Sequence, residues 1–207
     1  MQPGSWSSEQ GQRSFVERAR RGQIVEAAIE TIAEVGYAKA SFARIAARAQ
    51  ISAGLISYHF SGKSELMEQV VRDVDDAMER ALEGRVEGAE SHLAALRALI
   101  EGFVHYCADH PSQLIAVGQI EDSEDRGASE HEKSVSEFEQ LLREGQSHGE
   151  FRDFTPRLMA VTLLAALEAS PTELFARPDT DVGTYADELA TTFELAVQRP
   201  ARKELTR

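Results

Sequence analysis

Residues 41–66 read SFARIAARAQISAGLISYHFSGKSEL, and this stretch decides the fold. Its first part is a segment in which apolar residues recur at i, i+3, i+4 and i+7, the spacing of one helical face. These residues are Phe42, Ile45, Ala46 and Ala49. Ser41 precedes them and can cap the helix, because its side-chain oxygen accepts a backbone N–H that the first turn leaves unpaired. The pattern predicts a short amphipathic helix that begins at residue 42.

A tight turn and a second short helix follow. Residues 50–52 interrupt the first pattern, and Ser52 is placed to cap the next helix, over residues 53–60. Ile56 and Phe60 lie four apart, so both can point inward. Two short helices joined by a turn of about three residues predict a helix-turn-helix, whose second helix fits the major groove of DNA.

The outer surfaces of these helices supply the candidate DNA contacts. Arg44 faces away from the apolar stripe, and Gly54 has no Cβ, so its backbone can approach a phosphate closely. A third helix start follows Phe60, where Lys63 and the first backbone N–H groups can anchor a phosphate. The predicted DNA-binding residues are Ser41, Arg44, Ser52, Ala53, Gly54, Leu55, Ser57, Tyr58, His59 and Lys63.

The segment from about Arg18 to Arg72 contains four ordered motifs. They are I..AA...IAE.GY from Ile24 to Tyr37, S...IA..A..S.G from Ser41 to Gly54, HF at His59 and Phe60, and K.EL from Lys63 to Leu66. With these motifs the segment resembles the N-terminal domain of the tetracycline-repressor (TetR) family. The resemblance implies that residues 53–59 form the recognition helix and that Lys63 contacts a phosphate. It also implies a dimeric transcriptional regulator, usually a repressor that a small molecule bound in the C-terminal domain releases from DNA.

The chain departs from the family pattern at four positions. Members commonly have Gly, Lys, Thr and Tyr where this chain has Gln50, Ala53, Leu55 and Ser57. The last three lie on the predicted reading surface. We therefore expect base and phosphate contacts to be redistributed, with Tyr58 and His59 taking part of the role.

Charge is distributed unevenly along the 207 residues. The formal net charge is -13, but residues 13–72 carry +3 and residues 73–207 carry -15. Only the N-terminal part is therefore suited to meet phosphates. The predicted organisation is a mobile arm over 1–17, a DNA-binding domain over 18–78 with its motif at 41–60, and an effector-binding and dimerisation domain over 79–207. Four arginines at 13, 18, 20 and 21 either follow DNA phosphates or a minor groove, or form a solvated helix start.

The remaining sequence predicts helices throughout. Amphipathic or apolar segments cover residues 92–108, 114–120, 129–149, 156–169 and 185–197, and no run alternates with period two. An all-α fold follows. The segment after Pro156, RLMAVTLLAALEA, is apolar nearly all round and needs a second partner beyond its own core.

That surplus of apolar surface predicts a homodimer. Two late helices from each of two copies would form a four-helix bundle, and a two-fold dimer would read a palindromic operator. The alternative is a monomer whose last helices pack wholly on their own core. The predicted interface residues are Leu163, Leu167, Tyr185, Leu189 and Phe193.

An unknown small-molecule effector is predicted to bind in the C-terminal domain. Pockets combine apolar walls with a few polar groups, and the same residues could equally be plain core. The candidate lining residues are Phe103, Tyr106, Cys107, Leu114, Gln119, Phe138 and Leu164. His105 and Asp109 lie four apart but lack a third ligand, so the sequence predicts no metal and no cofactor.

Other classes of protein fit the sequence less well. One cysteine, no run of eighteen apolar residues and no leader predict a cytoplasmic protein that does not enter a membrane. Phosphate loops, nucleophile elbows and zinc-peptidase motifs are absent from the sequence, so an enzyme is not predicted. A helical protein-interaction module remains as the alternative to a DNA-binding protein. Salt dependence separates the two, because phosphate contacts weaken steeply with salt and an apolar interface does not.

Overall fold

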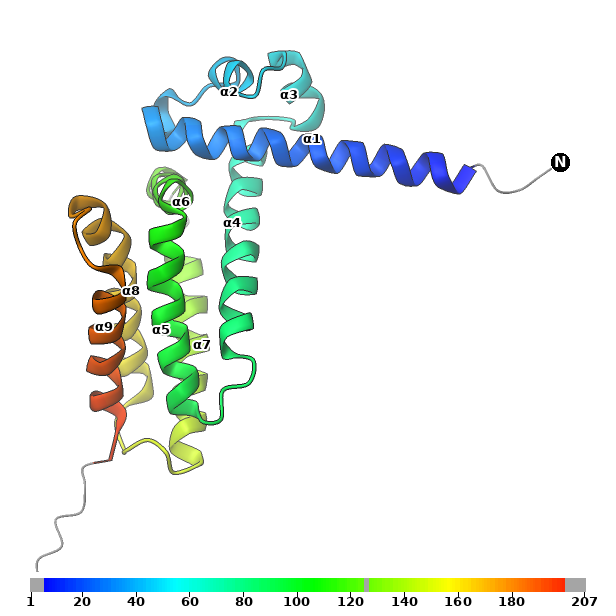
Figure 1. The fold of residues 1–207 in the computed structure, drawn as a ribbon. Coiled ribbons are helices and arrows are strands. Elements are labelled where there is room, and N and C mark those ends of the chain that lie inside the picture. Colours follow the sequence, from blue (N-terminus) through cyan, green and yellow to red (C-terminus); the bar gives the residue numbers. More distant parts are fainter. Residues whose placement is uncertain (1–5, 125–126, 200–207) are drawn as a thin grey trace, which may run out of the picture. The chain divides into compact units, whose positions relative to one another are not determined.

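The structure is a computed structural model that describes residues 6–124 and 127–199. Over these ranges it forms helices and no strand, which confirms the predicted all-α fold. The chain divides into two compact units (Figure 1). The N-terminal unit comprises residues 1–75 and 115–124, and the C-terminal unit comprises residues 76–114 and 125–207. The first boundary between the units thus lies after residue 75, and residues 115–124 belong to the N-terminal unit as well.

The N-terminal unit is built on a long first helix, α1, which spans Trp6–Val35. Part of the predicted arm, from Trp6 onward, belongs to this helix, while residues 1–5 lie outside the described residues. The helix ends before Gly36, whose φ of 86° requires the left-handed region that glycine enters without penalty. Ile24, Ala28 and Ile32 recur along one face of α1 and are fully buried, so this face forms the base of the core.

Four further elements complete this core. They are η1 (Tyr37–Lys39), α2 (Phe42–Arg48), α3 (Ala53–His59) and the first half of α4 (Lys63–Val86). The end of α6, which spans Pro111–Glu124, also belongs to it, with Ala116 and Ile120 fully buried in the same cluster. Gln119 on this helix accepts a hydrogen bond from the backbone N–H of Tyr37 at 2.8 Å. The side chain of Gln119, which was predicted to line an effector pocket, thus supports the N-terminal unit.

The C-terminal unit is a helical bundle around α5, which spans His92–Asp109. Three helices pack against it: α7 (Gly127–Ser147), α8 (Pro156–Ala176) and α9 (Val182–Val197). The predicted helices of this region match these in number and place, with most ends within three residues, but α8 runs seven residues beyond its predicted end. Gly145 allows a close approach in the bundle, because a Cβ built there would lie 2.2 Å from the ring of Phe151, which is fully buried.

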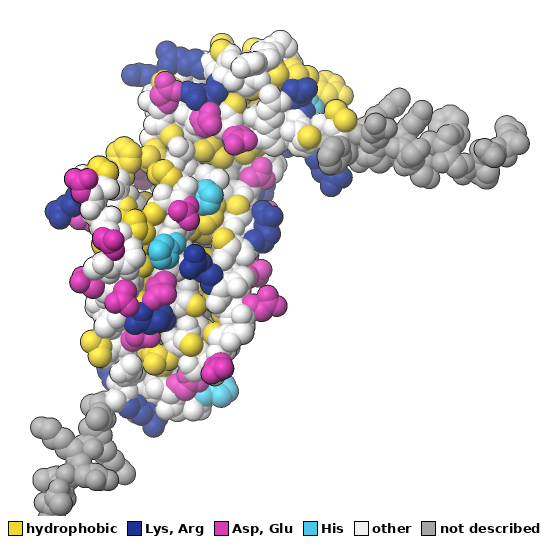
Figure 2. All heavy atoms as spheres, viewed as in Figure 1, with side chains coloured by type: hydrophobic (Ala, Val, Ile, Leu, Met, Phe, Trp, Pro, Cys, Tyr) yellow, Lys and Arg dark blue, Asp and Glu magenta, His cyan; other side chains and the backbone are white. Residues whose placement is uncertain are grey.

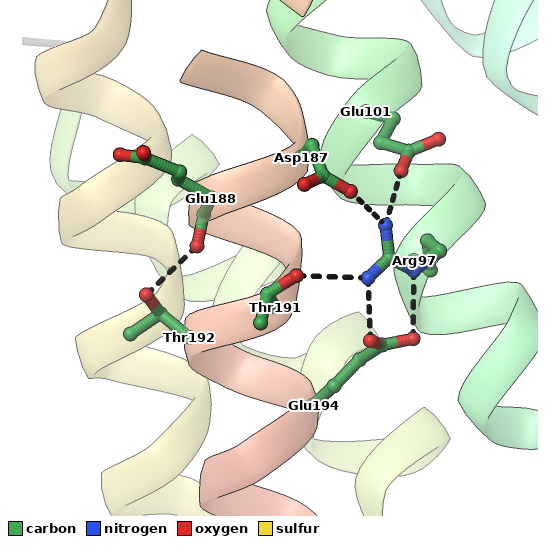
Figure 3. A network of polar contacts seen from close by, with 7 residues as sticks. All are labelled: Arg97, Glu101, Asp187, Glu188, Thr191, Thr192 and Glu194. Atoms are coloured by element: carbon green, nitrogen blue, oxygen red, sulfur yellow. Dashed lines mark hydrogen bonds and ion pairs between the residues drawn. The ribbon is translucent and has the colours of Figure 1, made fainter. Parts of the chain in front are cut away.

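Arg97 joins α5 to α9 through a polar network (Figure 3). Its Nε and Nη2 donate to the two carboxylate oxygens of Glu194, at 2.8 and 2.6 Å. Nη1 donates to Glu101 at 2.6 Å and to Asp187 at 2.9 Å, and Nη2 also donates to Thr191 at 3.0 Å. Hydrogen bonds to Glu194 first, then to the other two carboxylates, raise the pKa of Arg97 above its already high value. The guanidinium thus stays charged and ties the two helices together.

Cys107 lies on the buried side of α5. Its side chain is 3 % exposed, and burial raises the pKa of the thiol to about 12. The structure therefore holds this residue as a protonated, apolar core group.

The two sides of α8 differ sharply in burial. Leu163 and Leu167 lie in the core of the C-terminal unit, as does Phe193 of α9, so these three predicted dimer contacts are corrected to core residues. Tyr185 and Leu189 are half-buried. The apolar side chains that remain open on the outer side of these helices are Leu158, Val161, Phe175 and Leu195. By length and composition α8 could also cross a membrane, although no more than 28 % of its apolar window is buried within the chain.

Candidate DNA-binding site

The helix-turn-helix begins at a capped α2. Ser41 has extended backbone angles, and its Oγ accepts the backbone N–H of Arg44 at 3.4 Å, as the sequence predicts. Ile45 and Ala46 are buried, while Arg44 is exposed on the opposite side. Arg48 also lies outside but forms ion pairs with Glu30 and Glu34 of α1. Arg44, which was predicted to contact DNA, is thus a cation of α2 that is exposed at the surface.

The turn into α3 contains a strained residue. Gln50 has a φ of 55°, in the left-handed region where residues with a Cβ are disfavoured. Ile51 packs against the core of the N-terminal unit from the same turn. A polar surface cavity of about 470 Å³ opens beside this turn. Its lining residues are Gln23, Glu26, Ala27, Glu30, Arg48, Ala49 and Gln50, none of which was predicted to bind an effector.

α3 presents a small outward surface. Its N-terminus is capped by Ser52, whose Oγ accepts the backbone N–H of Leu55 at 3.2 Å. Ile56 and Phe60 are buried as predicted, with exposed fractions of 0 % and 1 %. The exposed members of the predicted reading surface are Ala53, Gly54, Ser57 and Tyr58.

Tyr58 and His59 differ in how far their side chains are exposed. Tyr58 is 77 % exposed, which is unusual for a large aromatic side chain and leaves the ring free to reach another molecule. His59 is half-buried, and its Nδ1 is buried without a hydrogen-bond partner among the described residues. The two rings meet edge to face, with centroids 5.1 Å apart. Leu55 is also half-buried, so Leu55 and His59 are less exposed than predicted.

Lys63 is the first residue of α4, where a phosphate contact was predicted. Its Nζ donates to the backbone oxygen of Tyr37 at 2.6 Å and lies 3.9 Å from the centroid of the Tyr37 ring. The ammonium group therefore fixes η1 against the start of α4. No local pattern predicts this contact, because the two residues are 26 positions apart.

Arg21, predicted as part of a basic cluster, contacts the last residue of α3 and the segment that follows it. Its Nη1 donates to the backbone oxygen of His59, and its Cζ lies 4.1 Å from the centroid of the Phe60 ring. Its Nη2 forms an ion pair with Glu65 at 3.6 Å. Hydrogen bonds from the backbone and side chain of Ser61 lower the pKa of Glu65, and the charge of Arg21 adds to this effect.

The remaining effector candidates lie in the C-terminal unit. Leu164 belongs to its core cluster, and Phe103 and Phe138 pack against that cluster while partly buried. Tyr106 and Cys107 are buried on α5, where the Tyr106 hydroxyl donates to Gln113 at 2.6 Å. Leu114 is half-buried. The described residues contain no group of three His, Cys, Asp or Glu side chains placed to hold a metal ion.

Comparison with known proteins identifies the motif-bearing segment. Residues 24–70, which contain α2, α3 and their turn, match the model of the family described as bacterial regulatory proteins, tetR family. This segment therefore has the sequence of a TetR-family N-terminal domain. The resemblance inferred from the four motifs is thereby confirmed.

The relatives of known name are transcriptional regulators, and the chain resembles a part of each. It is 46 % identical over 87 residues to the HTH-type transcriptional regulator BetI 1 of Chromohalobacter salexigens, covering 40 % of this chain and 42 % of that protein. It is 39 % identical over 85 residues to BetI of Cronobacter sakazakii, again covering 40 % of this chain and 42 % of the relative. The similarity thus spans about two fifths of the curated relatives.

Solved structures extend the likeness to most of the fold. A TetR-like transcriptional regulator from Rhodococcus sp. RHA1 superposes with a TM-score of 0.71 over 84 % of this chain and 93 % of its own, at 22 % identity. At this level of identity the match shows that the TetR-family fold, with its N-terminal helix-turn-helix and C-terminal helical region, is shared. It does not carry over a ligand.

Proposed function

We propose that the chain is a ligand-responsive transcriptional repressor that binds a palindromic operator as a homodimer. The observation that carries the proposal is the exposed surface of α3. A seven-residue helix, capped by Ser52 and anchored by Ile56, presents Tyr58 outward within the segment that matches the TetR family. Such a helix suits the major groove.

Electrostatics supports DNA contact through the N-terminal unit alone. Residues 13–72 carry a net charge of +3, whereas the rest of the chain is strongly acidic. Figure 2 shows acidic side chains spread over the helices of the C-terminal unit. Repulsion between these carboxylates and phosphates would confine DNA to the surface of the helix-turn-helix.

Selection of bound duplexes from a random pool with the full-length protein tests this function. We expect an inverted repeat to be enriched, because a two-fold dimer presents two copies of α3. Enrichment of asymmetric sites, or of none, would contradict the proposal. On the selected duplex, Tyr58→Ala should weaken binding without changing the thermal unfolding curve.

A matched pair of arginine variants separates DNA binding from a protein-interaction role. Arg44→Ala removes a cation from α2, and we expect the slope of log affinity against log salt to shrink by about 0.9. Arg80→Ala removes the same charge from an exposed site on α4 within the C-terminal unit and should leave the slope unchanged. An interaction module without DNA binding would show no steep salt dependence in either variant.

The dimer is proposed to form through the outer side of α8 and α9. Leu158 and Leu195 are each 67 % exposed, and Val161 adds to the apolar surface on α8. A second copy would cover these side chains, which explains an apolar helix that its own core leaves largely open. Burial in a membrane is the competing explanation for the exposed apolar side of α8. The proposed cytoplasmic location requires that the purified protein stay in solution without detergent.

Light scattering in solution tests the dimer. We expect wild-type protein to have twice the mass of one chain and Leu158→Glu to shift it toward one chain. Lys133→Glu, at an exposed site on α7, is the control and should remain a dimer. Equal behaviour of the two variants would remove this surface from the interface.

The effector is proposed to bind within the C-terminal unit near Phe103, Phe138 and Leu164, and to release the operator. Screening small molecules for release of the selected duplex identifies it. A Phe138→Trp variant that binds DNA normally but no longer responds would support this location. We propose binding, and not catalysis, as the chemistry of this chain, in keeping with the regulators it resembles.

A further inference from the structure

Arg21 contacts three successive parts of the N-terminal unit without lying on the outer surface of α3. Beyond its hydrogen bond to the backbone oxygen of His59 and its place over the Phe60 ring, its Nη2 lies 3.3 Å from Gln69 Oε1. The ion pair with Glu65 completes the set. The side chain is 30 % exposed, so most of the guanidinium is engaged within the protein.

The oxygen that Arg21 binds belongs to the last residue of α3. The last carbonyls of a helix have no partner within it, and a cation placed there also lies at the negative end of the helix dipole. Helices shorter than about 12 residues are marginal in water, so a helix of seven residues depends on its ends and its packing. Ser52 caps one end of α3, and Arg21 caps the other.

Glu65 contacts both the guanidinium of Arg21 and the segment that connects α3 to α4. Its Oε2 accepts the backbone N–H and the hydroxyl of Ser61, both at 2.7 Å, while its Oε1 faces Arg21. Ser61 is two residues beyond the end of α3. One carboxylate on α4 thus fixes both the chain that leaves α3 and the arginine that caps it.

We propose that Arg21 is a positioning residue for DNA binding. Without contacting DNA, it holds the C-terminal end of α3, and so the ring of Tyr58, in the arrangement that DNA requires. The inference rests on the proposed function and adds to it a residue from α1 that acts through the protein. Without the contacts of Arg21, α3 is less ordered in the free protein. DNA binding must then order this helix, which lowers the affinity for DNA.

The test uses full-length protein and the duplex that the wild type selects. Arg21→Met keeps the apolar stem over Phe60 and removes every donor. Arg20→Met removes the same charge from the adjacent position, where the arginine bonds Gln23 at 2.5 Å. Affinity is measured at several salt concentrations, at a temperature where circular dichroism shows both variants folded.

We expect Arg21→Met to bind about tenfold more weakly, the loss of one charge-assisted hydrogen bond, with a salt slope equal to that of the wild type. Arg21→Lys should recover part of the affinity, because an ammonium can still reach one acceptor. Unchanged affinity, or a loss no larger than that of Arg20→Met, would overturn the proposal. A slope reduced by about 0.9 would also overturn it, because Arg21 would then contact a phosphate directly.

Amide hydrogen exchange without DNA supplies an independent measurement. Arg21→Met should speed hydrogen exchange at the amides of residues 56–60. Unchanged exchange rates would overturn the proposal that Arg21 holds the end of α3. If the wild type selects no duplex, the proposed function fails while this measurement still decides whether Arg21 holds α3. If Arg21→Met does not fold, Glu65→Gln serves in its place, since it removes the ion pair but keeps an acceptor for Ser61.

Discussion

Gln50→Gly is expected to stabilise the protein. Among the described residues, Gln50 is the non-glycine residue with a positive φ, 55°, and its side chain is exposed in the turn between α2 and α3. In this region the Cβ of an L-residue crowds the following carbonyl oxygen, at a cost of roughly 1–2 kcal/mol. TetR-family proteins commonly have glycine here, so the strain follows from a departure of this chain from that pattern.

The size of the effect is a difference between two terms. Glycine removes the crowding but gives the unfolded chain more freedom, which costs about 0.4–1 kcal/mol. The net stabilisation is therefore roughly 0.5–1 kcal/mol, and the melting temperature should rise by a few degrees, on the order of 2–4 °C per kcal/mol. Gln50→Ala is the matched control, since it keeps the Cβ and the strain.

Thermal unfolding of the three proteins, followed by circular dichroism, measures the effect, with urea unfolding as a check. We expect Gln50→Gly to melt above the wild type and Gln50→Ala at or slightly below it. A glycine variant less stable than wild type would refute the reasoning. So would an alanine variant as stable as the glycine variant, because the Cβ would then carry no penalty.

Three further predictions concern packing and charge. Gly145→Ala should destabilise the protein by about 1–3 kcal/mol in urea unfolding, because its Cβ would meet the buried ring 2.2 Å away; a neutral effect would mean that the ring can move. Arg97→Met should cost about 1–3 kcal/mol, since it leaves the Glu194 carboxylate, 16 % exposed, without its guanidinium; unchanged stability would contradict a structural role for the network. Hydrogen bonds from Ser61 lower the pKa of Glu65 below its ordinary 4.5, so its contribution to stability is present above that pH and is lost as the pH falls through the folded pKa. A Glu65→Gln variant should therefore lose less stability than wild type in unfolding curves taken below pH 4.5, and an identical acid dependence would count against the interaction.

Local signals predicted the helix-turn-helix well. Ser41 and Ser52 each act on a backbone N–H three residues away, so the two caps and the turn between them could be read from a short stretch of sequence. Ile56 and Phe60 were placed in the core by their spacing alone. Sequence reasoning works here because the interactions that define these elements lie within a few residues of one another.

Contacts between distant residues were missed for the opposite reason. Arg21 meets the oxygen of His59 across 38 positions, and Gln119 meets Tyr37 across 82, distances over which a sequence pattern carries no signal. The side of α8 that faces the core was also misjudged at Leu163. An almost uniformly apolar helix has no periodicity to show which face is buried.

Because Cys107 is buried, the rate at which its thiol is labelled can report local opening of α5. Reaction with a thiol reagent requires the thiolate and access, so this residue should react only when α5 opens, and its labelling rate would measure that opening. Because it is the one cysteine in the chain, a second cysteine introduced at an exposed site such as Tyr58 would react far faster than the native thiol. A fluorophore or spin label could thus be attached to α3 while the buried thiol of Cys107 stays unmodified.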